Sequence, residues 1–145
     1  MSNIGANRPG DNEQRRRLLL RTTGDVAIAV MTARKMARSI GLKERDEFLV
    51  GTAVSELATN VIRYAEKGEA HLQVVHRKGG AGIEVVVKDK GPGIADMDSA
   101  LKDHSSTQDS LGLGLPSVKR MMDEFTLVSN IGQGTRATIR KWHKS

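Results

Sequence analysis

Four short segments of this chain combine residue types that could bind a nucleotide together with a metal ion. In chain order they are 56–60 (ELATN), 89–94 (DKGPGI), 112–116 (GLGLP) and 132–135 (GQGT). They supply an acid and an amide one helical turn apart, a carboxylate at the end of an apolar run, and glycine-rich turns. Glycine turns expose backbone N–H groups to phosphates, and an amide oxygen suits Mg²⁺. Because the sequence contains no P-loop pattern, it predicts a nucleotide site of another type.

The first segment lies in a stretch whose apolar residues recur at helical spacing. This spacing predicts a helix over 44–67, with Gly68 at its end. Glu56, Asn60 and Arg63 fall on a polar stripe opposite the apolar one. Asn is a poor residue for a helix interior, which favours a role for the Asn60 carbonyl as a Mg²⁺ ligand. Glu56 could then accept a proton from an attacking hydroxyl group, although an ordinary solvent face explains each residue alone.

Asp89 ends a predicted strand over 83–89 and shares its parity with the apolar residues of that strand. If those residues face the helices, the carboxylate points the same way and needs a partner. An adenine amino group is one candidate, and the backbone N–H groups of the following turn are the other. Gly91 and Gly93 would let the backbone of that turn approach a ring closely. Thr135 also has inward parity, which fits either a water-mediated contact with the base or an ordinary core position.

The third segment ends a long stretch with little apolar patterning, over 91–114. Long loops inside small domains are usually functional, and many act as lids. Gly112 and Gly114 come directly before a predicted helix over 116–124, with Pro116 in its first turn. Such a start exposes N–H groups to a phosphate, and it is equally compatible with a plain junction between a loop and a helix.

The remaining periodicities predict the elements that must position these segments. A helix over 26–40 begins after Asp25 as its cap and stops at Gly41. Strands are expected over 18–22, 71–77, 83–89, 125–129 and 135–142, with a turn at 79–82. Residues 1–14 have little apolar content and are expected to form a disordered arm, which leaves a single domain over 15–145.

The composition limits the classes of function that the chain can have. Its 145 residues suit one domain, and with 3% aromatic residues the core must be mostly aliphatic. The absence of cysteine excludes disulfides and thiolate zinc sites. The net charge of +6 comes without an aromatic platform, which argues against nucleic acid as a partner. The sequence has no signal peptide and no apolar run near the ~20 residues of a membrane span, which predicts a cytoplasmic protein without a membrane partner.

The four segments resemble the nucleotide-binding boxes of the histidine-kinase-like (GHKL) ATPase superfamily. The resemblance runs from roughly Leu18 to Trp142. Within that superfamily, the runs over 55–65 and 112–125 are most similar to the RsbT group of serine/threonine-protein kinases. Anti-sigma kinases of the RsbW and SpoIIAB type share the first of these runs better than the second.

The resemblance implies an α+β fold, a two-layer α/β sandwich in which helices cover one face of a mixed sheet. It implies ATP and Mg²⁺ as cofactors, with Glu56 as the catalytic base and Asn60 as the metal ligand. It also implies phosphoryl transfer to STAS-domain proteins (RsbS/RsbR-like) and a switch of partner to a PP2C-type phosphatase (RsbU-like). The implied nucleotide-binding residues are Asn60, Arg63, Asp89, Gly91, Gly93, Ile94, Gly112, Leu113, Gly114, Leu115 and Thr135.

The chain departs from the RsbT pattern in the predicted lid. The stretch over 104–110 (HSSTQDS) lacks a glycine pair that such lids commonly carry, which bears on lid closure and catalytic rate. Two alternatives to a kinase therefore remain, an anti-sigma factor of the RsbW or SpoIIAB type and a mainly non-catalytic, ATP-binding partner-switch protein. A sensor histidine kinase fragment ranks lower because the chain has no room for a dimerising helical hairpin. ATP-driven clamps of the gyrase type need further domains.

Overall fold

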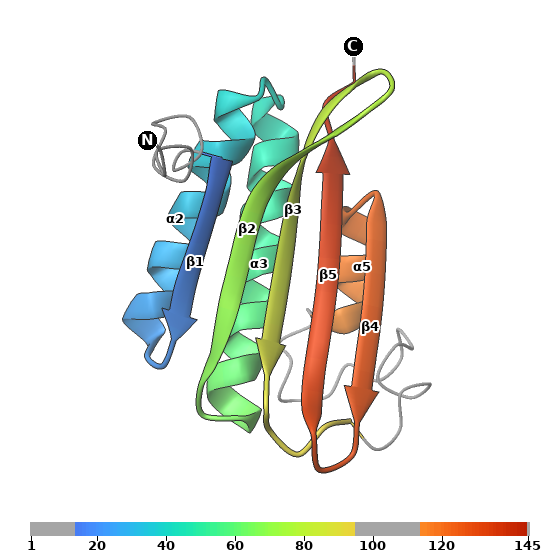
Figure 1. Cartoon of the computed structure of the whole chain (residues 1–145). Helices are drawn as coiled ribbons and strands as arrows, with labels where there is room; N and C mark the ends of the chain where they lie inside the picture. The colour runs from blue at the N-terminus through green and yellow to red at the C-terminus, as the bar shows by residue number, and fades with distance from the viewer. Residues whose placement is uncertain (1–13, 95–113, 145) are drawn as a thin grey trace, which may run out of the picture.

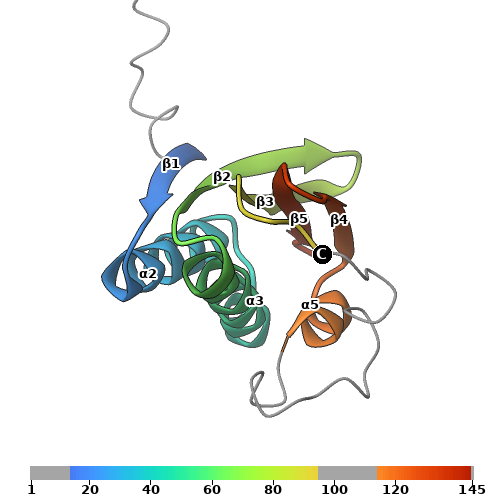
Figure 2. The ribbon, with the colours of Figure 1, turned by 90° about the horizontal axis from the view of Figure 1, so that it is seen from below.

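A computed structural model describes residues 14–94 and 114–144, in which helices cover one face of a sheet (Figures 1 and 2). The strands are β1 (Arg15–Leu20), β2 (Gly68–Arg77), β3 (Gly80–Asp89), β4 (Glu124–Asn130) and β5 (Gly134–Trp142). The helices are α2 (Thr23–Ser39), α3 (Glu44–Tyr64) and α5 (Leu115–Met121). The view along the sheet in Figure 2 places all three helices on the same side of it. The expected α+β class, with two layers and helices on one face, is confirmed.

The sheet has the strand order β1-β2-β3-β5-β4, and each of its four strand pairs is antiparallel. The expected mixed sheet is therefore wrong. Strand β4 runs parallel to β3 (Figure 1), but the chain carries it to the sheet edge and β5 returns between the two. Every neighbouring pair is consequently antiparallel.

The first helix, α2, starts with a capping box, and the N-cap residue predicted from the sequence was wrong. Thr22, not Asp25, is the N-cap, and its hydroxyl oxygen accepts a hydrogen bond from the Asp25 amide at 3.1 Å. The Asp25 carboxylate accepts bonds in return from the amides of Arg21 and Thr22. These bonds lower the pKa of Asp25, so the carboxylate remains ionised at the positive end of the helix.

The second helix is shorter at its C-terminus than its apolar pattern predicts. It ends at Tyr64 rather than Lys67, and Glu66 takes a left-handed conformation with φ 72°. Gly68 does not cap the helix; it begins β2 and pairs with Asp89. A Cβ at Gly68 would collide with the carbonyl oxygen of Lys88, so the chain can turn from α3 into the sheet at this point only with glycine.

The hydrophobic core lies between the sheet and the two long helices. Its fully buried side chains come from both layers and include Leu20, Val50, Val54, Leu72, Ile83, Val85 and Ile139. Glu47 is buried where α2 meets α3, and its carboxylate accepts hydrogen bonds from Arg34 at 3.0 Å and Arg38 at 2.9 Å. The bonds to Arg38 and Arg34 lower the pKa of Glu47. These two ion pairs hold α3 against α2, and they thereby position the residues that α3 presents to the sheet.

Within the described parts of the chain, no helix is long and apolar enough to cross a membrane. The predicted arm over 1–14 falls almost entirely outside the described residues, and so does most of the predicted lid. Both remain predictions.

Candidate functional site

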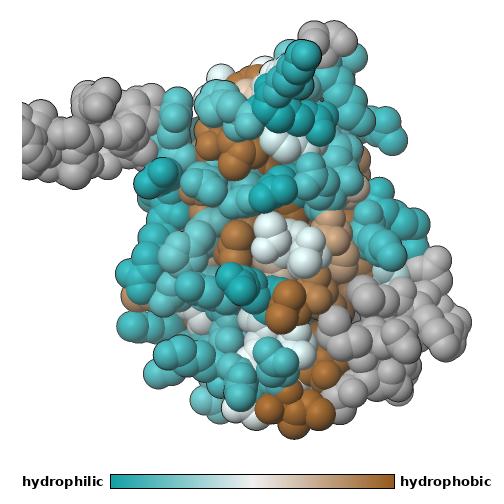
Figure 3. Space-filling model, turned by 45° about the vertical axis from the view of Figure 1, so that its right-hand side comes forward, coloured by the Kyte–Doolittle hydropathy of each residue, from teal (hydrophilic) through white to brown (hydrophobic). Residues whose placement is uncertain are grey.

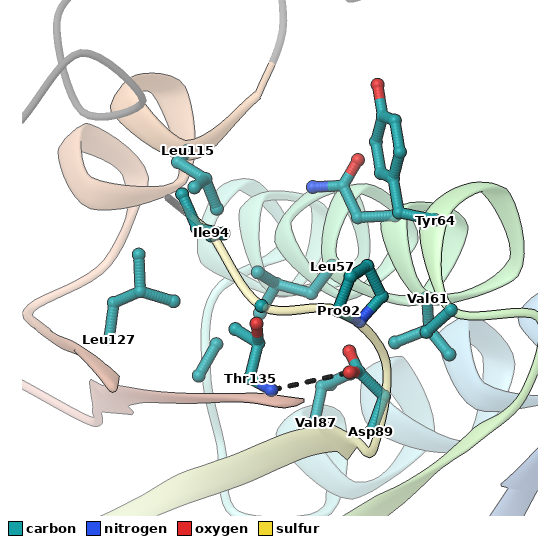
Figure 4. A pocket seen from close by; sticks show the side chains of 14 residues that line it. Leu57, Val61, Tyr64, Val87, Asp89, Pro92, Ile94, Leu115, Leu127 and Thr135 are labelled. Carbon is teal, nitrogen blue, oxygen red and sulfur yellow. Dashed lines mark hydrogen bonds between the residues drawn. The ribbon is translucent and has the colours of Figure 1, made fainter. Parts of the chain in front are cut away.

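A cavity of about 370 Å³ opens at the end of the sheet where β3 ends, between α3, the start of α5 and the inner face of the sheet (Figure 4). Each of the four predicted segments contributes residues to its lining. The lining residues are Leu57, Asn60, Val61, Tyr64, Ala65, Val87, Asp89, Pro92, Gly93, Ile94, Leu115, Leu127, Thr135 and Ala137. The cavity is large enough for a small organic ligand.

Asp89 lies at the floor of the cavity with its carboxylate held by backbone groups. Its Oδ1 accepts hydrogen bonds from the amides of Gly91 at 2.8 Å and Thr135 at 3.3 Å. The second bond crosses from β3 to β5 and is drawn in Figure 4. Both bonds end on Oδ1, so Oδ2 remains able to accept a hydrogen bond from a ligand. Backbone N–H groups and an adenine amino group, the two partners considered from the sequence, can therefore bind Asp89 together, because the backbone groups occupy one carboxylate oxygen and leave the other available.

Glycines permit the close backbone approaches that shape this floor. A Cβ at Gly91 would lie 2.6 Å from the Cβ of Ala65, the C-cap of α3. Gly93 has φ 83°, and a Cβ there would lie 2.5 Å from the carbonyl oxygen of Asn130. Gly134, with φ 117°, approaches the Asp89 carbonyl so closely that a Cβ would collide with it. These residues bring the turn after β3 against the β4–β5 turn.

Ser129 is a site residue that the sequence analysis missed. Its hydroxyl accepts a hydrogen bond from the Ile94 amide at 2.7 Å and lies 2.9 Å from the hydroxyl of Thr135. It therefore joins the turn after β3 to the paired strands β4 and β5. Its inward parity opposite Thr135 in the β4–β5 register was the available signal, but a serine near a strand end has no distinctive pattern.

Replacement of Ser129 by Ala is expected to lower the free energy of unfolding by about 1 kcal/mol, because the half-buried Ile94 amide loses its acceptor. The midpoint of thermal unfolding should fall by roughly 4 °C for a domain of this size, which calorimetry can measure. Thr126→Ala is the matched control, since Thr126 is exposed on the outer face of the same strand. Equal losses in both variants would mean that the Ser129 hydroxyl has no special role in holding Ile94.

The α3 wall of the cavity carries Asn60, which lines it, with Glu56 one turn earlier. Burial raises the pKa of Glu56, and the nearby positive charge of Arg63 opposes this rise. Arg63 itself is exposed, and its guanidinium lies 5.8 Å from the ring centre of Tyr64. Neither Glu56 nor Arg63 is among the lining residues, so of the polar stripe only Asn60 contacts the cavity.

The apolar half of the cavity corrects the predicted separation of the two stripes on α3. Leu57 and Val61, assigned to the core stripe, line the cavity beside Asn60. Leu57 lies three positions before Asn60 and Val61 lies one position after it, so both are on helix faces that adjoin that of Asn60. The polar and apolar stripes therefore meet at this wall. An apolar slot with a few polar groups at one end fits a flat ring better than a bare phosphate.

The start of α5 forms the remaining edge of the cavity. Leu115 lines it, and Gly114 is the N-cap of the helix with φ 137°. Pro116 is near the helix start as predicted, so it contributes no amide donor there. Gly112 and Leu113 lie outside the described residues.

The side chains at the cavity can be compared with the ligands that the expected Mg²⁺ ion needs. Among the described residues there is no group of three or more His, Asp or Glu side chains that could hold an ion. The Asn60 amide is a single oxygen donor at the cavity wall. One protein oxygen completed by phosphate and water oxygens fits Mg²⁺ better than ions that require several protein ligands.

Comparisons with known proteins agree with this fold. Residues 20–141 match the model of the histidine kinase-like ATPase domain. The serine/threonine-protein kinase RsbT of Bacillus subtilis (strain 168) is 40% identical over 121 residues, which cover 83% of this chain and 91% of that protein. The anti-sigma F factor of Geobacillus sp. (strain WCH70) is 29% identical over 100 residues, which cover 64% of this chain and 67% of that protein.

Two solved structures share the fold. The RsbU and RsbW domains of a Mycobacterium tuberculosis protein superpose with a TM-score of 0.64 at 16% identity, over 90% of this chain and 33% of that chain. The SiaB–SiaC complex from Pseudomonas aeruginosa gives a TM-score of 0.51 at 13% identity, over 89% of both chains. At these identities the likeness concerns the fold alone.

Proposed function

The chain belongs to the histidine kinase-like ATPase family and to its RsbT-type branch, and on this basis we propose that it is an ATP-dependent protein serine/threonine kinase. Its substrates are STAS-domain antagonist proteins, and it exchanges them for a PP2C-type phosphatase that it activates. The observation that supports this most is the cavity, because Asp89, Thr135 and Asn60 come from three distant segments and border one space.

Asp89 reads the base in this proposal. Its Oδ2 accepts a hydrogen bond from the adenine amino group, while Oδ1 stays on the amides of Gly91 and Thr135. The ring lies against the aliphatic side chains of Leu57 and Val61, with Ile94 nearby on the turn after β3. A guanine would present a carbonyl oxygen to the carboxylate instead of an amino group, so the site selects adenine.

The phosphates extend toward Asn60 and the start of α5. Bound Mg²⁺ would neutralise charge on the phosphate oxygens as the phosphoryl group moves. The Asn60 side-chain oxygen would hold that ion from the α3 wall, and Arg63 would contribute positive charge at the exposed end of the helix. The backbone at Gly112, Leu113, Gly114 and Leu115 is proposed to contact the phosphates.

Glu56 acts as the general base. It lies one helical turn from Asn60, which supports a place toward the reacting end of the triphosphate rather than toward the adenine. Partial burial raises the pKa of its carboxyl group, and a stronger base accepts the proton of a Ser or Thr hydroxyl more readily. The acceptor hydroxyl comes from the STAS-domain protein bound over the mouth of the cavity.

The anti-sigma alternative has weaker support. The relative that is an anti-sigma F factor is 29% identical over 64% of this chain, whereas the RsbT relative is 40% identical over 83%. The cytoplasm is the proposed location because ATP is available there.

Transfer to a STAS-domain protein tests the proposal directly. The purified chain is expected to move the γ-phosphoryl group of ATP to a Ser or Thr of a STAS-domain protein from the same genome, in a reaction that requires Mg²⁺. Mass spectrometry identifies the modified residue, and ATP should also raise the midpoint of thermal unfolding by mass action. The assignment would be contradicted if ATP did not stabilise the chain and the chain phosphorylated no STAS-domain protein of that genome.

A further inference from the structure

The face of the sheet that carries no helix presents side chains in rows across the strands. In the row nearest the cavity end, Glu69 on β2 pairs with Lys88 on β3, and Lys88 pairs with Arg136 on β5. Leu19 and Val128 end this row on the two edge strands. Figure 1 looks onto this face, and Figure 3 shows hydrophilic residues over much of the surface with hydrophobic patches between them.

The acids of this face already have partners on it. Glu69 accepts hydrogen bonds from Arg17 at 2.9 and 3.1 Å, and the bonds from Arg17 and His71 lower its pKa to about 2. Glu84 and Glu124 both accept hydrogen bonds from Arg140. None of these carboxylates bonds to Lys88 or Arg136.

Lys88 and Arg136 therefore form a direct cross-strand pair of like charges, without an ion pair to any described residue. Both side chains are exposed on the outer face, so they contribute nothing to the core. Like charges directly opposite each other on neighbouring strands destabilise a sheet. An anion bound across the pair would remove that repulsion.

A shallow hollow of about 630 Å³ adjoins the pair and gives room for such a ligand. Val86 on β3 is part of its lining, and Arg15, Arg17 and His71 border it from the β1–β2 side. The hollow thus combines an apolar patch with a cationic border. It also contains Glu84, so its charge is mixed rather than uniformly positive.

We propose that this open sheet face docks an acidic surface of a partner protein, with carboxylates of the partner at Lys88 and Arg136 and an apolar side chain against Val86. Nucleic acid fits less well, because Glu84 would repel phosphates and the described lining offers no Phe, Tyr or Trp side chain for stacking. A second copy of this face fits less well, because its cations outnumber its acids and the two surfaces would repel. The docking face lies on the side of the sheet opposite the nucleotide cavity, so this inference stands without the proposed kinase activity.

Fluorescence anisotropy with a labelled short peptide of alternating Glu and Val tests the charge of the ligand. The full-length chain should bind this peptide more weakly as salt is raised, and it should bind a Lys–Val peptide far less well. The double variant Lys88→Gln, Arg136→Gln should bind the acidic peptide about tenfold more weakly. The control is Lys35→Gln, Lys78→Gln, which removes two exposed cations from other surfaces and should bind within about twofold of the parent.

Two further measurements decide whether the pair serves docking rather than folding. The midpoint of thermal unfolding of the Lys88→Gln, Arg136→Gln protein should equal or exceed that of the parent, because a repulsion is removed. Amide shifts in NMR spectra should move along β3 and β5 when the acidic peptide is added. A lower midpoint, shifts confined to the helices, tighter binding of a single-stranded oligonucleotide, or dimerisation lost in the variant would each overturn the proposal.

Discussion

Glu56→Gln is expected to reduce phosphoryl transfer to a STAS-domain protein by about 10²- to 10⁴-fold while ATP affinity stays within about twofold. Gln keeps the size of the side chain but cannot accept the hydroxyl proton. The nucleotide contacts proposed for Asp89, Thr135 and Asn60 should survive the change, because these three residues line the cavity and Glu56 does not. Single-turnover transfer and calorimetric titration with ATP measure the two quantities separately.

The pH dependence gives a second readout of the same residue. Burial raises the pKa of Glu56, and the base must be ionised to act, so kcat/KM should fall as the pH drops through that raised pKa. The Glu56→Gln protein should lack this acidic limb. Its thermal stability at neutral pH should not fall, because a raised pKa means that folding disfavours the ionised carboxylate above that pKa.

The matched control for this prediction is Glu44→Gln on the same helix. Glu44 is exposed in the first turn of α3, three turns or more from the cavity, and the change should leave transfer unaltered. Parental activity in the Glu56→Gln protein would mean that another group accepts the proton.

Asp89→Asn is expected to weaken ATP binding by about 10- to 100-fold. The amide oxygen of Asn can still accept the hydrogen bonds that Gly91 and Thr135 donate to Oδ1, so the floor of the cavity should keep its shape. The amide nitrogen replaces Oδ2, and a donor then faces the adenine amino group. The preference for ATP over GTP should shrink as well, since guanine presents an acceptor at that position.

Calorimetric titration with ATP and with GTP measures both effects of Asp89→Asn. Glu66→Gln serves as control, because Glu66 is an exposed acid beside the same end of α3 and is not part of the cavity lining. An ATP affinity equal to that of the parent would exclude Asp89 from base recognition.

Much of the fold follows from local patterns in the sequence. The apolar periodicity of α2 and α3 and the strand alternation around Val85 and Ile139 were sufficient to assign those elements. The parity of Asp89 and Thr135 correctly put both side chains on the helix side of the sheet, where the Thr135 amide bonds to the carboxylate. Patterns of this kind depend only on neighbours in the chain.

The features that the sequence did not reveal depend on contacts between distant segments. The apolar pattern of α3 reaches Ala65, but Gly68 already belongs to β2 and pairs with Asp89 of β3, so the chain leaves the helix at Tyr64. The antiparallel sheet results from the insertion of β5 between β3 and β4, which no local pattern encodes. Ser129 joins two turns only because the β4–β5 pair holds it opposite Thr135.

The insertion of β5 has a consequence for when the protein becomes competent to bind nucleotide. The β2–β3 and β4–β5 hairpins are local, whereas the pairing of β3 with β5 closes a long loop and should be the slow step in assembling the sheet. Asp89 and Thr135 sit on opposite sides of that seam. A chain whose last strand has not yet paired with β3 therefore lacks the complete cavity to which we assign the adenine, even if its helices have already formed.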